Sequence, residues 1–308
     1  MFEGVLLLHK PQGMTSHDCV AKLRKILKTK KIGHTGTLDP DVSGVLPICV
    51  GRATKIVEYL TSESKMYEAE VTIGFSTTTE DASGEIVEEK KVSQEINKKN
   101  ILSVLESLTG SIEQIPPMYS AIKVNGKKLY EYARQGIEVE RPKRIIQIHK
   151  LDLLSSIIRE KGLLKFKFRV RCSKGTYIRT LAVMIGEKLG YPAHMSHLIR
   201  TESGSFKLED CLTFEQILSE LERNQLQEKM ISISQALKDL PNMTINDTLA
   251  EKVLNGAVLP LPNEFKSLDL EAVFAVYNLQ GSCLALYKKH PVKDGLMKPA
   301  KIFVIQQS

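Results

Sequence analysis

The order of apolar and polar residues predicts several strands in the first two thirds of the chain. Residues 5–8 form a short apolar run that ends before Pro11 and Gly13, which is typical of a buried strand. Apolar and polar side chains alternate in residues 67–75, as they do in a half-buried strand. Residues 165–172 alternate as well, so we expect one face to pack on the core. The other face carries four positive charges, those of Lys165, Lys167, Arg169 and Arg171.

Helical spacing marks the segments between these strands. Thr15 and Ser16 are candidate helix caps, and the apolar residues after them recur every three or four positions up to Leu27. Shorter helices are predicted in three further segments, residues 53–60, 101–108 and 181–189. Residues 76–84 are polar and predict a loop.

The sequence changes character near residue 240. Residues 225–243 are polar with helical spacing and contain Pro241, so we place a domain boundary here, between residues 1–238 and residues 239–308. Beyond it we expect three short strands, at residues 273–277, 283–287 and 301–305. Long strands with intervening helices predict an α+β fold. Its core would be a mixed, largely antiparallel sheet flanked by helices, followed by a small β-rich C-terminal domain.

Charge adds a class of partner to this picture. The chain has 308 residues and a formal net charge of +7, which favours a polyanionic partner such as a nucleic acid. The helix after Thr15 has a basic face, formed by Lys22, Arg24, Lys25 and Lys28. Such a face is either solvated or in contact with phosphates, and the sequence alone favours neither interpretation.

Cysteine spacing and hydropathy argue against several other classes. The five cysteines lie far apart without a C-x-x-C pair, which favours reduced thiols over a disulfide framework or a zinc site. His194 and His197 are close in sequence but no third metal ligand is evident, so we interpret them as structural or RNA-facing. No stretch approaches the roughly 18 apolar residues of a membrane span, and no glycine motif for a nucleotide cofactor occurs. We therefore expect a cytoplasmic protein that does not associate with membranes.

Residues 33–47, which read GHTGTLDPDVSGVLP, form the strongest candidate for chemistry. The glycines permit a tightly wound backbone and the close approach of a ligand. Asp39 precedes Pro40, which holds its backbone extended and favours a fixed carboxylate. The alternative is an Asp-Pro turn whose side chain bonds only local amides, and from these residues alone that alternative is favoured.

Further blocks of sequence reverse this preference. Besides the GHTGTLDP loop, the chain contains Lys10-Pro11 with Gly13, QIPPMYSAIKVNG at residues 114–126, CSKGTYIRTL at residues 172–181 and HLIRT at residues 197–201. In this order, over residues 4–206, the blocks resemble the TruB family of tRNA pseudouridine synthases. The short segment before Lys10 resembles the stand-alone bacterial type more than the guide-RNA-directed branch of the same superfamily.

The resemblance implies an activity and a set of partners. A member of this family converts the T-loop uridine at tRNA position 55 to pseudouridine without a cofactor or a metal. It implies that the partner is the T stem-loop of tRNA, that no protein partner is needed and that the protein is a monomer. The family often ends in an RNA-binding module of the PUA type, which the resemblance assigns to residues 239–308.

The resemblance also implies roles for individual residues. Asp39 corresponds to the catalytic carboxylate. The residues that correspond to substrate-binding groups are His34, which wedges against the RNA, Tyr67, which stacks on the uracil, Tyr177 and Arg179, which line the pocket, and Leu198, which packs against the base. Arg179 would pair with Asp39, and Lys10 and Pro11 would support the site from beneath. Without the family, His34 could satisfy a loop hydrogen bond, Tyr67 could be core and Arg179 a surface charge.

The reaction explains why these residue types are needed. Pseudouridine formation loses no group and changes no oxidation state, so it requires neither cofactor nor energy source. A carboxylate can attack the ribose or the uracil ring and divide one difficult step into easier ones, and a neighbouring Arg179 would favour its ionised form. The rival hypothesis is a tRNA-binding folding helper without catalysis, which would not need Asp39 together with Tyr67 and Arg179.

Overall fold

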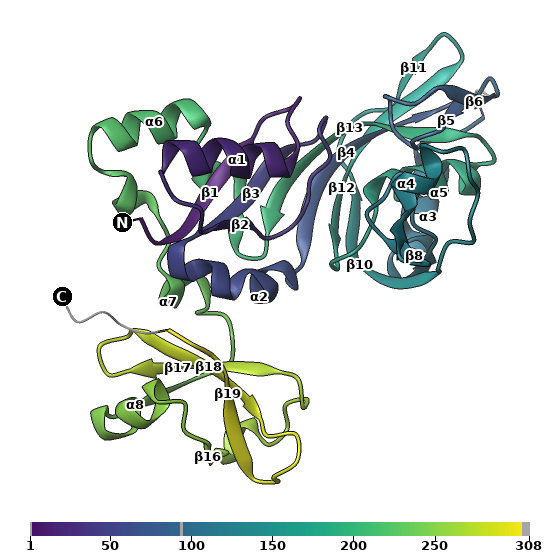
Figure 1. Ribbon diagram of the computed structural model, residues 1–308. Coiled ribbons are helices and arrows are strands. Elements are labelled where there is room, and N and C mark those ends of the chain that lie inside the picture. Colours follow the sequence, from purple (N-terminus) through teal and green to yellow (C-terminus); the bar gives the residue numbers. More distant parts are fainter. Residues whose placement is uncertain (1, 93–94, 304–308) are drawn as a thin grey trace.

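The computed structural model describes residues 2–92 and 95–303, and its centre is a ten-stranded sheet (Figure 1). The strands follow the order β1-β3-β13-β4-β12-β10-β7, with β2, β11 and β14 paired to β3, β12 and β13. Their bounds are β1 Gly4–Lys10, β2 Ile32–His34, β3 Ser43–Val50, β4 Lys65–Ile73, β7 Gly110–Gln114, β10 Arg144–Leu153, β11 Ile158–Glu160, β12 Leu163–Cys172, β13 Ala193–Ser203 and β14 Phe206–Lys207. Nearly all neighbours are antiparallel, which confirms the predicted fold class.

One contact in this sheet is parallel and very short. It pairs Ile199 with Ser43 and Arg200 with Gly44, and it joins β13 to β3. In the strand order, this contact alone connects β1, β2 and β3 to the remaining strands of the described sheet. We call it the seam. Two half-sheets therefore meet at two residue pairs.

Helices cover both half-sheets. They are α1 Ser16–Ile26, α2 Val57–Thr61, α3 Lys98–Ser107, α4 Leu129–Ala133, α5 Ile178–Leu189, α6 Phe214–Glu222, α7 Ile233–Ala236 and α8 Asp247–Leu254. Figure 1 shows α1 and α6 beside the β1–β3 half, whereas α3, α4 and α5 lie with the other half. Thr15 caps α1, as predicted, by accepting a hydrogen bond from the backbone of Asp18. The helix predicted at residues 53–60 is a 3₁₀ turn, Gly51–Ile56, that continues into α2.

The alternation predicted for residues 165–172 is confirmed, since every second side chain of β12 is buried. Two of the four positive charges on its other face are paired, Arg169 with Glu68 at 2.6 Å and Arg171 with Glu202 at 2.6 Å. The segment predicted as a loop, residues 76–84, begins inside a short strand, β5 (Phe75–Thr77), which pairs with β6 (Ile86–Glu89). The hairpin was missed because β6 is exposed and only Thr77 of β5 is buried, so its strands show no alternation of apolar and polar residues.

A second, five-stranded sheet forms the C-terminal part, in the order β15-β17-β18-β19-β16. Its strands are β15 Asn242–Ile245, β16 Leu259–Pro260, β17 Val273–Asn278, β18 Cys283–Lys289 and β19 Leu296–Ile302. The strands predicted at residues 273–277 and 283–287 are confirmed. The third prediction, residues 301–305, is wrong in its position because β19 starts at Leu296, and residues 304 and 305 lie outside the described residues. The boundary between residues 238 and 239 stays a prediction.

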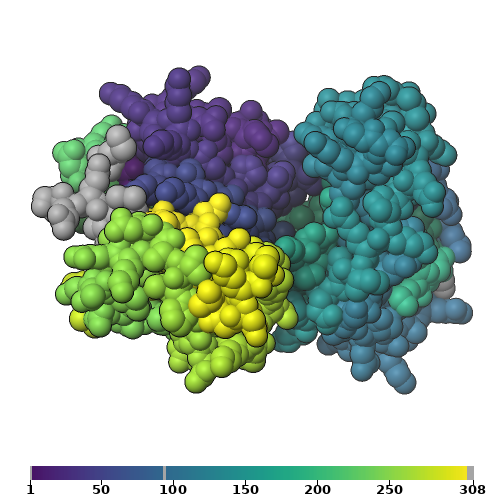
Figure 2. Space-filling view, turned by 60° about the horizontal axis from the view of Figure 1, so that its bottom comes forward, coloured from purple at the N-terminus to yellow at the C-terminus, as the bar shows by residue number. Residues whose placement is uncertain are grey.

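The C-terminal sheet shares a core with the first half-sheet. Leu286 and Ala275 of this sheet belong to the same buried cluster as Val5 of β1 and Val45 of β3. Lys55 adds a hydrogen bond to the carbonyl of Ile302, at 2.9 Å. Figure 2 shows the result as two lobes separated by a groove: the N-terminal residues and the C-terminal sheet form one lobe, and the teal-coloured middle of the chain forms the other.

Candidate active site

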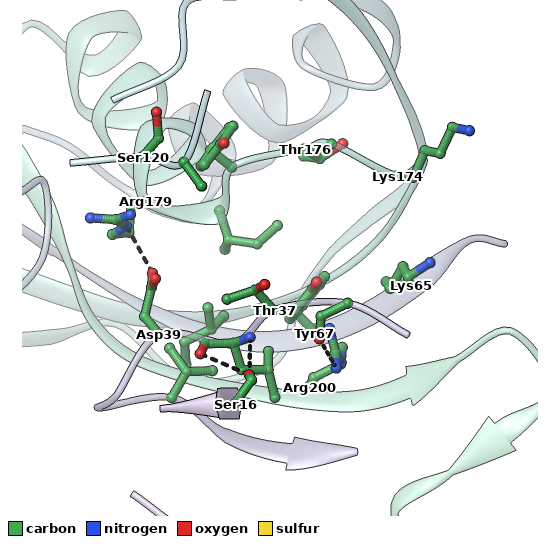
Figure 3. Close-up of a pocket in the computed structure, with 18 of the residues that line it drawn as sticks. Ser16, Thr37, Asp39, Lys65, Tyr67, Ser120, Lys174, Thr176, Arg179 and Arg200 are labelled. Atoms are coloured by element: carbon green, nitrogen blue, oxygen red, sulfur yellow. Dashed lines mark hydrogen bonds and ion pairs between the residues drawn. The ribbon is translucent and has the colours of Figure 1, made fainter. Parts of the chain in front are cut away.

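A pocket of about 680 Å³ lies between the loop before β3, the start of β4 and the first turn of α5 (Figure 3). Its walls come from both half-sheets and therefore from segments far apart in sequence. Residues 35–40 and residues 15–17 form one side, and residues 119–121, residues 173–179, Leu198 and Arg200 form the other. The seam thus lies beneath the pocket.

The loop that carries Asp39 is fixed from two directions. The Ser16 hydroxyl accepts a hydrogen bond from the amide of Leu38 at 2.9 Å and donates one to its carbonyl at 3.2 Å. Lys10 is fully buried, and its ammonium donates to the carbonyls of Pro11 at 2.9 Å, Met14 at 2.5 Å and Pro40 at 3.1 Å. These contacts leave the Asp39 side chain 45% exposed and directed into the pocket. They agree with the supporting positions predicted for Lys10 and Pro11.

Arg179 holds the carboxylate from the other side of the pocket. Its Nε lies 3.2 Å from Oδ2 of Asp39, and its side chain is only 7% exposed, so it is not the surface charge of the alternative interpretation. Nη1 donates to the Thr79 carbonyl at 3.0 Å and lies 3.4 Å from Asp81, and Nη2 donates to the Tyr119 carbonyl at 2.8 Å. The guanidinium is therefore oriented by three further groups before any substrate enters.

Asp81 was not found from the sequence. It lies in the polar segment interpreted as a loop, and no spacing rule connects it to a residue nearly a hundred positions later. The loop is nevertheless ordered, because the Asp81 carboxylate accepts hydrogen bonds from the hydroxyls of Thr79 and Ser83, each at 2.6 Å. A Thr-x-Asp-x-Ser pattern of this kind is a signal for such a turn.

Tyr67 and Arg200 form the floor between the two half-sheets. Tyr67 on β4 is opposite Arg200 on β13, and both border the pocket. Arg200 is 1% exposed and donates to the carbonyls of Val45 at 2.7 Å and Gly36 at 3.2 Å. Burial raises the pKa of the Tyr67 hydroxyl, and the adjacent Arg200 opposes this effect. The phenol is therefore neutral at neutral pH.

Arg200 was also missed, although the HLIRT block contains it. Side chains two positions apart on a strand share a face, so the choice of Leu198 already implied that Arg200 points toward the same pocket. Gly44, its partner in the seam, has a φ of +117°, and a Cβ atom there would lie 2.2 Å from the Arg200 carbonyl oxygen. Only glycine permits this approach of the two backbones.

Tyr177 and Leu198 also lie where the sequence placed them. Tyr177 precedes α5 and lines the pocket, and the Gln114 side chain bonds both its amide, at 2.8 Å, and its carbonyl, at 3.0 Å. Burial is the main cause that raises the pKa of its hydroxyl. Leu198 on β13 is 7% exposed and borders the same cavity.

His34 is beside the pocket and not in its wall. It ends β2, and its Nδ1 accepts a hydrogen bond from the Gly36 amide at 3.3 Å, the local contact of the alternative interpretation. Its ring lies edge-on to His17, with centroids 5.4 Å apart. Burial, followed by the neighbouring His17 and Arg200, lowers the pKa of His34, so the ring is uncharged at neutral pH. Its predicted contact with RNA stays a prediction.

The remaining candidates have structural surroundings. His194 is buried and its Nδ1 lies 3.1 Å from the Phe75 carbonyl oxygen, whereas His197 is exposed. Within residues 2–92 and 95–303, no three His, Cys, Asp or Glu side chains are grouped as metal ligands would be. All five cysteines are free thiols. No helix in the described ranges is both long enough and apolar enough to cross a membrane.

Comparison with known proteins gives consistent matches. Residues 24–178 match the family described as TruB family pseudouridylate synthase (N terminal domain). Residues 179–263 match the tRNA pseudouridylate synthase B C-terminal domain. The chain is 62% identical over 304 residues to tRNA pseudouridine synthase B of Bacillus subtilis, covering 99% of this chain and 98% of that protein. It is 63% identical over 304 residues to the protein of the same name from Bacillus licheniformis, with the same coverage.

Solved structures extend the similarity to a more distant group. A chain of an H/ACA ribonucleoprotein bound to a substrate RNA containing 2′-deoxyuridine superposes with a TM-score of 0.74 and 27% identity, covering 99% of this chain and 86% of that chain. The archaeal box H/ACA Nop10-Cbf5 complex gives a TM-score of 0.73 and 26% identity, covering 99% of this chain and 87% of that chain.

Proposed function

The chain belongs to the TruB family of pseudouridylate synthases, and we propose that it uses the Asp39 carboxylate to isomerise the T-loop uridine of tRNA. It is an isomerase that converts uridine at tRNA position 55 to pseudouridine. The observation that supports the role of Asp39 is its ion pair with Arg179 at the edge of a pocket that Tyr67 and Tyr177 also border.

The geometry of the carboxylate suits a nucleophile. Arg179 binds Oδ2 through its Nε, so Oδ1 is available for attack on a base or ribose in the pocket. The carbon–nitrogen glycosidic bond breaks, the uracil turns, and a bond forms from the same ribose carbon to C5. The C5 proton is lost and N1 gains one, so the product is an isomer of the substrate. Attack on the ribose carbon and attack on the uracil ring both fit this arrangement.

The two tyrosines have complementary tasks in the proposal. Their raised pKa values keep both phenols neutral, so each can stack on uracil or hydrogen-bond to it while the base turns. Extruding the base from the T loop costs a few kcal/mol, and stacking on an aromatic face returns roughly 1–3 kcal/mol. In this proposal Leu198 packs against the base, and His34 contacts the RNA at the pocket entrance beside His17.

Binding of the tRNA would depend on basic residues around the groove. Part of the basic face of α1 is already engaged, since Arg24 donates to the Ile32 carbonyl at 3.2 Å and the Lys22 ammonium lies 4.0 Å from the centre of the Phe214 ring. Lys25 and Lys28 are exposed and available for phosphates. Residues 239–308 would extend this surface as an RNA-binding domain of the PUA type.

The proposal includes the state of the protein in the cell. We assign it to the cytoplasm as a monomer that acts on tRNA without a protein partner. The monomer is supported by relatives named tRNA pseudouridine synthase B, which the chain matches over nearly their whole length, whereas the H/ACA neighbours belong to complexes with other proteins. Size-exclusion chromatography of purified, active protein tests it, and activity confined to an oligomer or to a mixed complex would contradict it.

Release of tritium from tRNA labelled at uracil C5 tests the role of Asp39. We expect release by the wild type and none above background by Asp39→Asn, while tRNA binding is largely retained. Asp41→Asn is the matched control, because Asp41 is an exposed carboxylate in the same loop, and it should behave like the wild type. Turnover by Asp39→Asn would remove Asp39 from its role. Absence of turnover by the wild type, with tRNA still bound, would favour the folding-helper hypothesis.

A further inference from the structure

The pocket has a second charged end, opposite Asp39. In Figure 3 Lys65 and Lys174 lie at this end of the pocket, one above the other with space between their ammonium groups, whereas the Asp39–Arg179 pair lies at the other end. Both lysines border the pocket. The proposed chemistry at Asp39 uses neither of them.

Lys65 is buried, and one of the hydrogen-bond donors of its ammonium group has no partner among the described residues. The residue is 6% exposed, and its ammonium donates to the carbonyls of Thr61 at 2.7 Å and Glu63 at 2.6 Å. An ammonium has three donors, and the buried Lys10 uses all three on backbone carbonyls. Within the described residues Lys65 makes two such bonds, so its third N–H can serve a ligand in the pocket.

Lys174 approaches the same place from the neighbouring strand. Cys172, the last residue of β12, pairs with Lys65 in register, and Lys174 follows two positions later. Its ammonium donates to the Ser62 hydroxyl at 3.1 Å, and its side chain is exposed. Both lysines are therefore tied to the short segment of residues 61–64, one buried and one at the surface.

The positive charge at this end is poorly compensated. Burial raises the pKa of the Glu63 carboxyl to about 7, so this acid is only partly ionised near neutral pH. Burial first, and then Arg200 and Lys174, lower the pKa of Lys65 to about 8 despite the opposing effects of Glu63 and Cys172. An anion bound here would stabilise the protonated lysine.

The spacing along β4 indicates which anion fits. Lys65 and Tyr67 are two residues apart on one strand, so their side chains leave the same face about 7 Å apart. If Tyr67 stacks on the target uracil, the backbone phosphate of the same nucleotide falls near Lys65. A phosphodiester carries one negative charge and oxygens that accept from both ammonium groups.

We propose that Lys65 and Lys174 bind a phosphodiester that adjoins the flipped uridine, and that they fix how far the nucleotide enters the pocket. The proposal rests on the proposed function, because it takes Tyr67 as the stacking residue. The two lysines act as positioning residues. They reach the reacting atoms only through the nucleotide that they hold.

Binding of T-arm RNA with one methylphosphonate linkage tests the proposal, since this linkage removes a single phosphate charge. The linkage is placed on the 5′ or the 3′ side of the target uridine, and Kd is measured in an Asp39→Asn background. The variants are Lys174→Met and Lys65→Met, and Lys188→Met is the matched control, an exposed lysine on α5 that does not border the pocket.

When both lysines are present, we expect one of the two methylphosphonate linkages to weaken RNA binding about tenfold. In Lys174→Met the same linkage should weaken binding by less than about twofold. In Lys188→Met the tenfold loss should persist. The proposal would be overturned if each methylphosphonate linkage lowered RNA affinity equally in the protein with Lys174 and in Lys174→Met. The comparison with Lys174→Met tests the proposal even if Lys65→Met fails to fold. Conversion of unmodified RNA by the wild type is measured in parallel, so a failure of the proposed function is recognised separately.

Discussion

At the scale of single residues, the site depends on one guanidinium with several partners. Arg179 contacts Asp39 through Nε and uses its two terminal nitrogens for Asp81 and two carbonyls. A planar guanidinium that makes contacts through all three of its nitrogens has one orientation. The position of Asp39 relative to a bound uridine is therefore set by residues that the uridine does not touch.

Asp81→Asn should reduce kcat about tenfold with little change in tRNA affinity. The amide keeps the shape of the side chain but removes the charge that holds the Nη1 side of Arg179, so the Asp39–Arg179 pair becomes less well defined. Single-turnover rates and Kd, measured together, separate the two effects. Glu85→Asn, in the same hairpin, should leave both unchanged. An equal loss of affinity would show that Asp81 acts on binding and not on positioning.

Glu63 gives a prediction about stability and pH. Its pKa in the folded protein is about 7, above the ordinary 4.5, because burial disfavours the charged form. Protonation therefore stabilises the fold fully below about pH 4.5, and this contribution is lost as pH rises through 7. Glu63→Gln should match the wild type at pH 5 and melt a few degrees higher at pH 8, a gain of about 1 kcal/mol after allowance for partial exposure.

Thermal melting at several pH values checks this expectation. Glu222→Gln, an exposed position on α6, is the control and should follow the wild type throughout. A Glu63→Gln variant that is less stable than the wild type at pH 8 would mean that the ionised Glu63 is a favourable partner of Lys65.

At the scale of secondary-structure elements, the seam has the closest approach to backbone atoms among the glycines of the described residues. The backbones of Gly44 and Arg200 approach so closely that a Cβ at position 44 would lie 2.2 Å from a carbonyl oxygen and 2.7 Å from an amide nitrogen. Neither atom belongs to a flexible side chain. Added volume here must separate the strands.

Gly44→Ala should therefore reduce stability by roughly 3 kcal/mol or more and abolish most activity in the fraction that folds. Gly110→Ala is the matched control, since Gly110 has a φ of +103° but no atom within 4 Å of the added Cβ. It should cost only the strain of a positive φ, about 1 kcal/mol. Denaturant unfolding measures both, and equal losses would mean that the close approach of the strands does not matter.

Local patterns predicted the elements that carry this architecture, and they failed where partners come from elsewhere. The strand of Tyr67, the helix after Thr15 and the alternation of β12 follow from side-chain periodicity, because each buries one face. The pairing of Arg169 with Glu68 could not be predicted, since it depends on the register of β12 against β4. Asp39 and Arg179 were identified through the family resemblance, whereas the contact of Asp81 with Arg179 depends on tertiary structure and could not be predicted.

At the scale of the whole molecule, the C-terminal sheet supports the half-sheet formed by β1, β2 and β3. Leu286 lies in a cluster with Val5 and Val45, whereas its neighbour Leu284 lies in a separate cluster formed by the C-terminal sheet with α8 and the segments around them. Lys301 also pairs with Glu58 at 3.0 Å across this interface. The two sheets should therefore not unfold independently.

Leu286→Ala and Leu284→Ala provide a matched test of this coupling. Each removes a fully buried leucine and should cost about 2–5 kcal/mol. Hydrogen exchange should become faster in β1 and β3 for Leu286→Ala, and only within the C-terminal sheet for Leu284→Ala. Identical exchange patterns in the two variants would contradict a shared core.

The short seam, with its two residue pairs, has a consequence for how this protein could be inhibited. Asp39 is anchored to one half-sheet and its partner Arg179 to the other, so a rotation of a few degrees about the seam would pull them apart while each half kept its own core. A compound that wedged between the halves would then inhibit without resembling uridine or RNA. Such an inhibitor would act at the seam beneath the pocket, and it would slow the reaction by separating Asp39 from Arg179.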